Sequence, residues 1–163
     1  MRNILMGLLL LCSLPAVSFG LCLEHEILQI AEREYPADAR MRRHVYNKQL
    51  TACRYMDNLF ESDVKDIAYR EYPGDYSMQK YTYDKQLIAK QYMESVDDYE
   101  IEQFAKREYP ADYSMQKYVY DKQVTAKQYM RHQDNSAAKT RAQLEYPADY
   151  AMQKYVYDRS LNN

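Results

Sequence analysis

The sequence repeats itself with a period of 37 residues. Each copy opens with Glu-Tyr-Pro, at Glu34, Glu71, Glu108 and Glu145. The second and third copies are identical at 19 of 23 positions over residues 71–93 and 108–130. A period of this length is typical of proteins built from stacked supersecondary units. We therefore predict four similar units, covering residues 23–59, 60–96, 97–133 and 134–163.

Each unit is expected to form a short helix, a break and a longer helix. In the second unit Ile67 and Ala68 follow Val64 by three and four residues, a spacing that is typical of one buried face of a helix. The Tyr-Pro pair then ends the short helix, because proline disfavours the α conformation in the preceding residue. Asp75 can cap the longer helix, expected over residues 76–93. Two helices joined by so few residues fold back as an antiparallel hairpin.

The predicted fold class is therefore all-α, with four helix-turn-helix repeats that form a small α-solenoid or a repeat bundle. Few glycines and prolines, with many good helix formers, agree with this class. In architecture the chain resembles the helical-hairpin repeat class, to which the tetratricopeptide and Sel1-like repeats belong. The resemblance rests on the period and the hairpins, since the glycine and alanine pattern of tetratricopeptide helices is absent.

Residues 1–20 have the pattern of a signal peptide. Arg2 supplies a positive start, an apolar run follows, and small residues flank the expected cleavage site after Gly20. A membrane anchor needs about 20 unbroken apolar residues, and Pro15 interrupts the run. We predict that residues 21–163 form the mature helical repeat domain, which has no membrane span and is periplasmic or secreted.

Charge and motifs exclude several classes of function. The formal net charge is −2, and loss of Arg2 with the leader makes it more negative. A nucleic-acid-binding domain is typically basic, so no nucleic acid is expected as a partner. His25, His44 and His132 are scattered, no serine lies beside a plausible base, and no glycine-rich loop could hold a phosphate. We predict no enzymatic activity and no cofactor.

Cys22 and Cys53 are predicted to form a disulfide. Both lie about 20 Å from the turn of an antiparallel first hairpin, on the two arms at the same level. An oxidising compartment permits the bond. The alternative is a zinc site that uses Cys22, His25 and His44, but a second tight pair of ligands is missing. We therefore predict no metal site.

On a helical wheel the long helix of the second unit has two apolar faces. The wide face includes Tyr81, Ile88, Tyr92 and Met93, and the narrow stripe includes Tyr76, Tyr83 and Leu87. One face can pack within the hairpin and the other on the next unit, as in a solenoid. The alternative is that the narrow stripe stays exposed and binds a ligand. The tyrosines expected in the core are Tyr81, Tyr92, Tyr118 and Tyr129.

Repeated residues outside the expected core form a candidate binding surface. Core packing tolerates swaps of similar volume, so identical surface residues need another cause, either a repeated ligand contact or recent duplication. Glu71 and Glu108 also oppose the helix macrodipole, which indicates a compensating partner. The candidate surface comprises Glu71, Tyr76, Gln79, Tyr83, Glu108, Tyr113, Gln116 and Tyr120.

One position holds a cation in every unit. These residues are Lys48, Lys85, Lys122 and Arg159. The wheel places them in the wide apolar face, so we expect a buried stem that reaches water or a side chain paired with a carboxylate. The functional alternative is a ladder of cations for an anionic ligand.

The expected function is protein–protein interaction by an exported, non-enzymatic helical-repeat protein with an unidentified protein partner. Two alternatives stay open. One is a structural protein of the cell envelope that self-associates through its own ends. The other is a carbohydrate or cell-wall binder that uses tyrosine platforms, although the chain has no tryptophan.

Overall fold

The computed structural model of this protein describes residues 22–134 and 136–162, and the predicted signal peptide, residues 1–20, lies outside them. Over the described residues the chain forms eight α-helices and no strand, which confirms the all-α class. No helix in this part of the chain combines the length and apolarity needed to cross a membrane. The helices are α1 (Glu24–Glu34), α2 (Ala39–Asp57), α3 (Asp63–Glu71), α4 (Tyr76–Ser95), α5 (Tyr99–Glu108), α6 (Tyr113–Arg131), α7 (Ala137–Glu145) and α8 (Tyr150–Leu161).

Each short helix ends directly before a Tyr-Pro pair, as predicted. Tyr72, at the end of α3, leaves the helical conformation with a φ of −131°, while its N–H still donates to Ala68. Each long helix follows an aspartate cap, which is also as predicted. For α4 the carboxylate of Asp75 accepts the N–H of Met78 at 3.1 Å. Such a cap stabilises a helix by about 1 kcal/mol, so the local sequence sets these boundaries.

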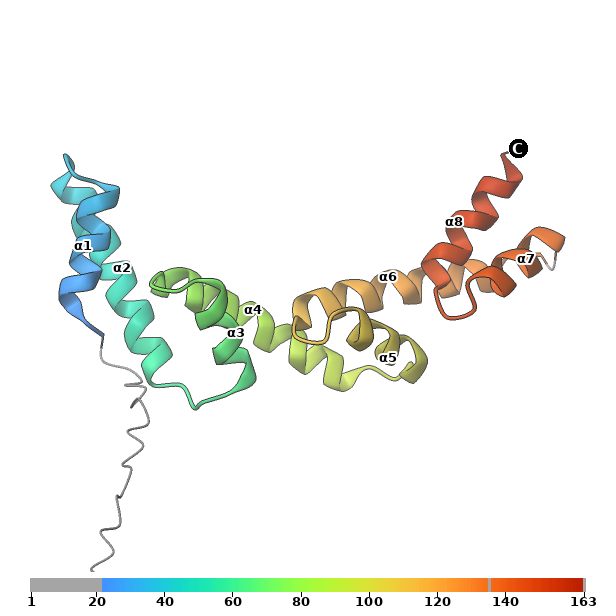
Figure 1. Cartoon of the computed structure of the whole chain (residues 1–163), viewed down its shortest axis with the longest axis horizontal. Helices are drawn as coiled ribbons and strands as arrows, with labels where there is room; N and C mark the ends of the chain where they lie inside the picture. Colours follow the sequence, from blue (N-terminus) through green and yellow to red (C-terminus); the bar gives the residue numbers. More distant parts are fainter. Residues whose placement is uncertain (1–21, 135, 163) are drawn as a thin grey trace, which may run out of the picture.

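The helices pack in the order in which they follow one another. Each short helix packs on the long helix after it, and these two helices are called a hairpin below. Each long helix also packs on the next one, α2 on α4, α4 on α6 and α6 on α8. Figure 1 shows the resulting elongated, bow-shaped array, with α1 and α2 at one end and α7 and α8 at the other. The contact between one long helix and the next hairpin is called a joint.

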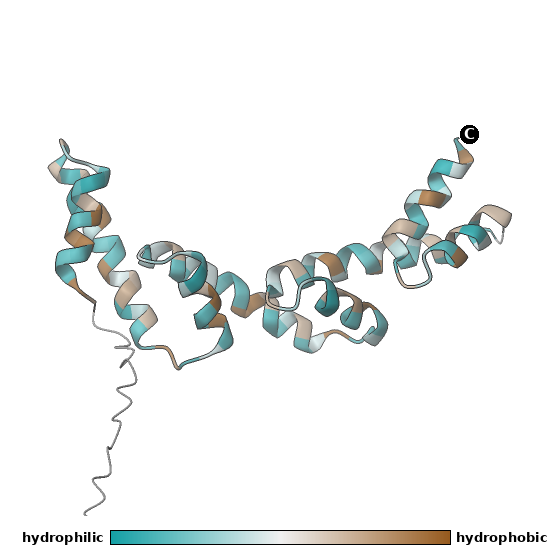
Figure 2. Ribbon diagram, viewed as in Figure 1, coloured by the Kyte–Doolittle hydropathy of each residue, from teal (hydrophilic) through white to brown (hydrophobic). Residues whose placement is uncertain are grey.

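In the described residues three small clusters of buried apolar side chains lie one at each joint, and further buried apolar residues such as Ile27 and Ala31 lie within the first hairpin. The cluster between α4 and the hairpin α5–α6 contains Met93, Ile101, Ala105 and Tyr120. The other two contain Met56, Val64, Ala68 and Tyr83, and Met130, Ala142 and Tyr157. Figure 2 accordingly shows apolar residues in short groups along the whole ribbon. Because each cluster is small, each joint also depends on its polar contacts.

The buried face of the long helices differs from the predicted one. On α4 this face runs through Gln79 and Gln86 and includes Tyr83. Tyr81 and Ile88, predicted to lie in the core, are 61% and 65% exposed. Of the other predicted core tyrosines, Tyr118 is exposed, and Tyr92 and Tyr129 are only half-buried. The helical wheel assigned apolar residues rather than glutamines to the buried faces, whereas a polar side chain can be buried when it is hydrogen-bonded.

Candidate functional site

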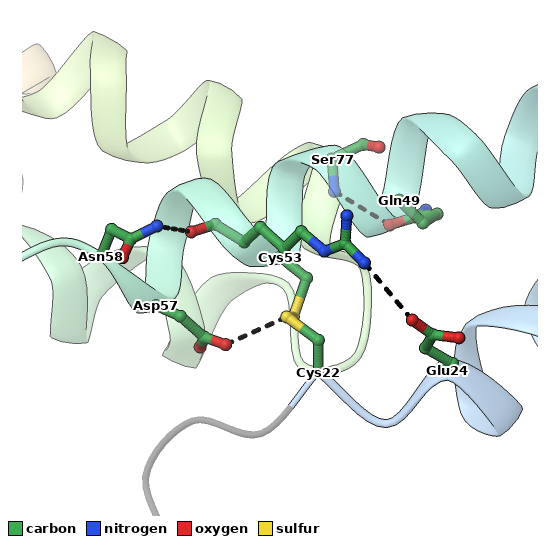
Figure 3. The surroundings of a disulfide bond; sticks show 8 residues. Cys22, Glu24, Gln49, Cys53, Asp57, Asn58 and Ser77 are labelled. Atoms are coloured by element: carbon green, nitrogen blue, oxygen red, sulfur yellow. Dashed lines mark hydrogen bonds and ion pairs between the residues drawn. A yellow bond between two sulfur atoms is a disulfide. The ribbon is translucent and has the colours of Figure 1, made fainter.

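Cys22 and Cys53 are joined by a disulfide, as the hairpin geometry predicts. Their sulfur atoms are 2.11 Å apart and their Cα atoms 5.9 Å apart. Figure 3 shows the bond tying the segment before α1 to α2. The carboxylate of Asp57 lies close to both sulfur atoms. The sulfurs are bonded to each other, so they offer a metal no thiolate, and the bond staples the N-terminal hairpin.

The glutamines of the predicted binding surface lie inside the fold instead. Gln79 Nε2 donates a hydrogen bond to the carbonyl oxygen of Tyr72 at 2.8 Å, and Gln116 Nε2 donates to that of Tyr109 at 2.6 Å. These carbonyls lie at the ends of α3 and α5, where a helix leaves its last carbonyls without partners. Gln79 and Gln116 are each 2% exposed, so the prediction that they form a binding surface is wrong.

In the first hairpin Arg42 occupies the position of Gln79 and makes the same kind of contact. Its guanidinium donates to the carbonyl oxygens of Tyr35 and Pro36 at 3.1 and 2.6 Å. The requirement at this position is therefore a long side chain with an N–H donor. The glutamine therefore recurs because the turn of each hairpin leaves a carbonyl oxygen that needs a hydrogen-bond donor.

A second glutamine on the long helices links each hairpin to the next. Gln86 Nε2 donates to Asp112 at 2.9 Å, and Gln86 Oε1 accepts the N–H of Ser114 at 3.1 Å. Equivalent contacts join Gln49 to Asp75 and Ser77, and Gln123 to Asp149 and Ala151. Figure 3 includes the bond between Gln49 and Ser77. This link was not predicted from the sequence, although the recurrence of the glutamine every 37 residues indicates a role that each unit shares.

At the edge of each joint a tyrosine and a lysine hold the same carboxylate. Tyr92 donates its O–H to Asp121 at 2.6 Å, and Lys117 Nζ lies 2.6 Å from the other oxygen. The same ammonium lies 4.2 Å from the centre of the Tyr92 ring. Equivalent sets are Tyr55, Lys80 and Asp84, and Tyr129, Lys154 and Asp158. The hydrogen bond to Asp121, then burial and that negative charge, raise the pKa of Tyr92 to about 12.

Tyr113, predicted to bind a partner, uses its hydroxyl within the array. It donates to Asp63 at the start of α3, and Lys90 Nζ donates to the same carboxylate at 2.8 Å. The hydrogen bonds from Lys90 and then from Tyr113 lower the pKa of the Asp63 carboxyl. A similar set at the next hairpin contains Tyr150, Lys127 and Glu100. The position thus ties a long helix to the short helix of the preceding hairpin, α6 to α3 and α8 to α5.

Two more tyrosines of the predicted surface belong to the core. Tyr83 and Tyr120 are buried in the joint clusters. Their rings meet those of Tyr55 and Tyr92 edge-on, with centroids 6.3 and 6.2 Å apart. The prediction that Tyr83 and Tyr120 are available for binding is therefore wrong. Of the remaining predicted residues, Tyr76 is half-buried, and Glu71 and Glu108 are exposed.

The repeated cations are also placed differently from the prediction. Lys48, Lys85, Lys122 and Arg159 are all exposed. Within residues 22–134 and 136–162, none of the four takes part in an ion pair. The interpretation of these residues as buried or paired is therefore wrong. Each cation directly precedes the position of a joint glutamine in the sequence, so its side chain lies about 100° around the helix from that buried position.

Three of these cations follow an exposed tyrosine by four residues, which makes the two side chains neighbours on the helix surface. Tyr81, Tyr118 and Tyr155 are 61%, 60% and 57% exposed. Tyr155 and Arg159 also line an open hollow of about 450 Å³ along α8. We call Tyr81–Lys85, Tyr118–Lys122 and Tyr155–Arg159 the exposed Tyr–cation pairs. In the first hairpin His44 takes the place of the tyrosine before Lys48.

The fold and its polar joints define an all-helical protein of sequentially packed hairpins. No protein-family model, curated protein or solved structure matches the chain. The candidate site therefore rests on its own geometry, a pair of exposed side chains that recurs on α4, α6 and α8.

Proposed function

We propose that this protein is an exported, non-enzymatic array of four copies of one helical repeat, which binds a protein partner through its exposed Tyr–cation pairs. The observation that carries the proposal is that these pairs recur with the period of the array, while their side chains form no hydrogen bond or ion pair with the part of the chain that the structure describes. Tyrosine is enriched at the centres of protein interfaces, because it combines a large apolar ring with a hydrogen-bonding hydroxyl.

The internal contacts explain most of the identity between the second and third repeats. Gln79 and Gln86, for example, recur as Gln116 and Gln123 because each satisfies backbone or capping groups. Tyr81 and Lys85 recur as Tyr118 and Lys122 without such a role. Tyr155 and Arg159 extend the same chemistry to α8, with arginine in place of lysine. Binding of the same ligand by all three pairs explains why each pair keeps both the positive charge and the tyrosine ring.

Self-association through the ends is the weaker alternative. If two copies docked end to end, the interface between them would have to reproduce the contacts of an internal joint. The position of the joint glutamine is Ser160 in the last hairpin, and that of the carboxylate Asp84 is Asn47 in the first. Ser160 lacks the amide of the joint glutamine, and Asn47 lacks the negative charge of the joint carboxylate. Sedimentation equilibrium at increasing concentration tests this alternative, and a constant monomer mass would exclude it.

Export is part of the proposal, and two features support it. The first is the leader-like pattern of residues 1–20, and the second is the disulfide between Cys22 and Cys53, which is typical of oxidising compartments. The intact mass of the protein purified from its native compartment is expected to correspond to residues 21–163. A mass that retains the leader would contradict the proposal.

Photo-crosslinking in cells tests the binding function directly. A photoreactive amino acid replaces Tyr118 on the exposed face of α6, and in a control chain it replaces Glu94, which is exposed at the end of α4. We expect the first chain to crosslink one defined protein, and the control chain to leave it unlabelled. With the photoreactive residue kept at 118, Y81S and Y155S together should weaken the product. Equal labelling from both positions, or none from 118, would contradict the proposal.

A further inference from the structure

The array repeatedly holds a carboxylate with one tyrosine hydroxyl and one lysine ammonium. Asp121 is held by Tyr92 and Lys117, and Asp63 by Tyr113 and Lys90. The other sets are Tyr55 and Lys80 on Asp84, Tyr129 and Lys154 on Asp158, and Tyr150 and Lys127 on Glu100. Within the described residues, this combination of three side chains is thus, beside the joint glutamines, a recurring way in which one helix is tied to another.

The exposed Tyr–cation pairs offer the same two donors without the carboxylate. Tyr81 precedes Lys85 by four residues, the spacing by which Lys80 reaches Asp84 on the same helix. The carboxylate that completes the internal sets comes from a neighbouring helix or from the lysine's own helix. For the exposed pairs, the aspartate beside each cation (Asp84, Asp121 and Asp158) is already held by an internal set. Neither donor is therefore paired within the described residues, and both face solvent.

The distribution of charge favours an acidic partner at this face. Each of the four long helices carries more basic than acidic residues, whereas α1, α3 and α5 each carry more acidic ones. The basic excess is largest on α2, whose cations include Arg43 and Lys48. A positive patch steers a negative partner during encounter and repels a positive one. The net negative charge of the whole chain therefore conceals a basic excess on the long helices, to which the unpaired Lys85, Lys122 and Arg159 contribute.

We propose that the exposed Tyr–cation pairs are binding sites for aspartate and glutamate side chains of an acidic protein segment. In each pair the tyrosine hydroxyl and the neighbouring ammonium or guanidinium donate to one carboxylate of that segment. The inference rests on the proposed function, because it names the chemistry of the partner that the same face binds. The three pairs give such a segment three equivalent contacts, one on each of α4, α6 and α8.

A labelled oligo-glutamate peptide tests this chemistry on the mature, disulfide-bonded chain. Fluorescence anisotropy at physiological salt, where the Debye length is about 8 Å, should show binding, and an oligo-serine peptide of equal length should not bind. K85Q/K122Q/R159Q should weaken oligo-glutamate binding by about tenfold, since three exposed ion pairs each contribute modestly. Y81F/Y118F/Y155F keeps the rings and removes the hydroxyls, and a loss of about tenfold or more is expected from the three missing hydrogen bonds.

The matched control removes the same charge from a different face. R33Q/R70Q/R107Q takes three exposed cations from the short helices, whose neighbouring residues do not include an exposed Tyr–cation pair. Its binding should stay within about twofold of the unchanged chain, because long-range charge is screened by salt. Equal losses in the two charge variants, or no loss in the tyrosine variant, would overturn the inference. Circular dichroism of each variant checks that its helicity is unchanged.

The crosslinked peptide from cells separates this inference from the proposed function. If position 118 captures a defined protein at an Asp- and Glu-rich segment, both stand. Capture at a segment without acidic residues would overturn the inference and leave the binding function intact. A third outcome is that a second copy of this chain is captured and that the dimer dissociates in K85Q/K122Q/R159Q. The acidic segment then belongs to the protein's own short helices, and the proposal of a separate partner is overturned.

Discussion

Gln86 of α4 donates a hydrogen bond of 2.9 Å to Asp112, the residue that caps α6. The cap carboxylate thereby serves two helices, because the same Oδ1 accepts the N–H of Met115 at 3.0 Å. The other half of the Gln86 amide accepts the N–H of Ser114. One buried side chain thus fixes where the next long helix begins relative to its neighbour.

Replacing Gln86 by alanine should loosen the joint between α4 and α6. The change leaves the Ser114 N–H without its partner, and a buried group left unsatisfied costs about 1–3 kcal/mol. We expect a lower midpoint of urea unfolding, together with faster amide exchange at the start of α6. Gln91→Ala is the control, because Gln91 is exposed on the same helix and should change stability by less than about 0.5 kcal/mol. Equal effects of the two changes would contradict the proposed link.

Met93→Ala tests the apolar half of the same joint. Met93 is fully enclosed by Ile101, Ala105 and Tyr120, so its truncation leaves a cavity. A loss of about 2–5 kcal/mol is expected for a buried methionine. Because the core is divided among the joints, hydrogen exchange should rise in α5 and α6 more than in α1 and α2. Uniform loss of protection along the chain would show instead that the array unfolds as one unit.

Reduction of the disulfide should destabilise the N-terminal hairpin in particular. Cys22 and Cys53 are 31 residues apart, and the chain-entropy model assigns such a loop about 3–4 kcal/mol. With a reducing agent present, we expect α1 to lose protection from exchange first, while α7 and α8 keep theirs. C22S/C53S should reproduce this pattern without a reducing agent. Alkylation of both thiols in the unreduced exported protein would contradict the pairing.

Tyr92→Phe should make the array less sensitive to alkaline pH. Folding raises the pKa of Tyr92 from its ordinary value of 10.0 to about 12. A raised pKa means that the stabilisation is complete below pH 10 and is lost between about pH 10 and 12, when the phenol ionises beside Asp121. Helicity followed across this range, with absorbance of the phenolate, measures the effect.

In the phenylalanine variant the loss of helicity between pH 10 and 12 should be smaller than in the unchanged chain. Tyr99→Phe is the control, since Tyr99 is 72% exposed and donates no hydrogen bond within the described residues. An alkaline transition that is the same in all three chains would show that Tyr92 is not linked to unfolding.

The helix boundaries and the disulfide could be predicted from the sequence because their causes are local. Proline restricts the residue before it, and an aspartate reaches amides only two or three residues later. The hairpin then follows from the short turn, and it brings Cys22 and Cys53 to the same level. Each of these steps needs no knowledge of what packs against the hairpin.

The chain by itself therefore determined where its helices begin and end, and that they form hairpins in order. Which side of each long helix is buried was decided by the tertiary structure. A glutamine such as Gln86 can be buried only where another helix presents a cap carboxylate and a free N–H, and those partners lie 26 and 28 residues away in the sequence. Burial of the glutamine side leaves Tyr81 and Lys85 exposed to solvent, and this places the candidate site on the exposed side of the long helix.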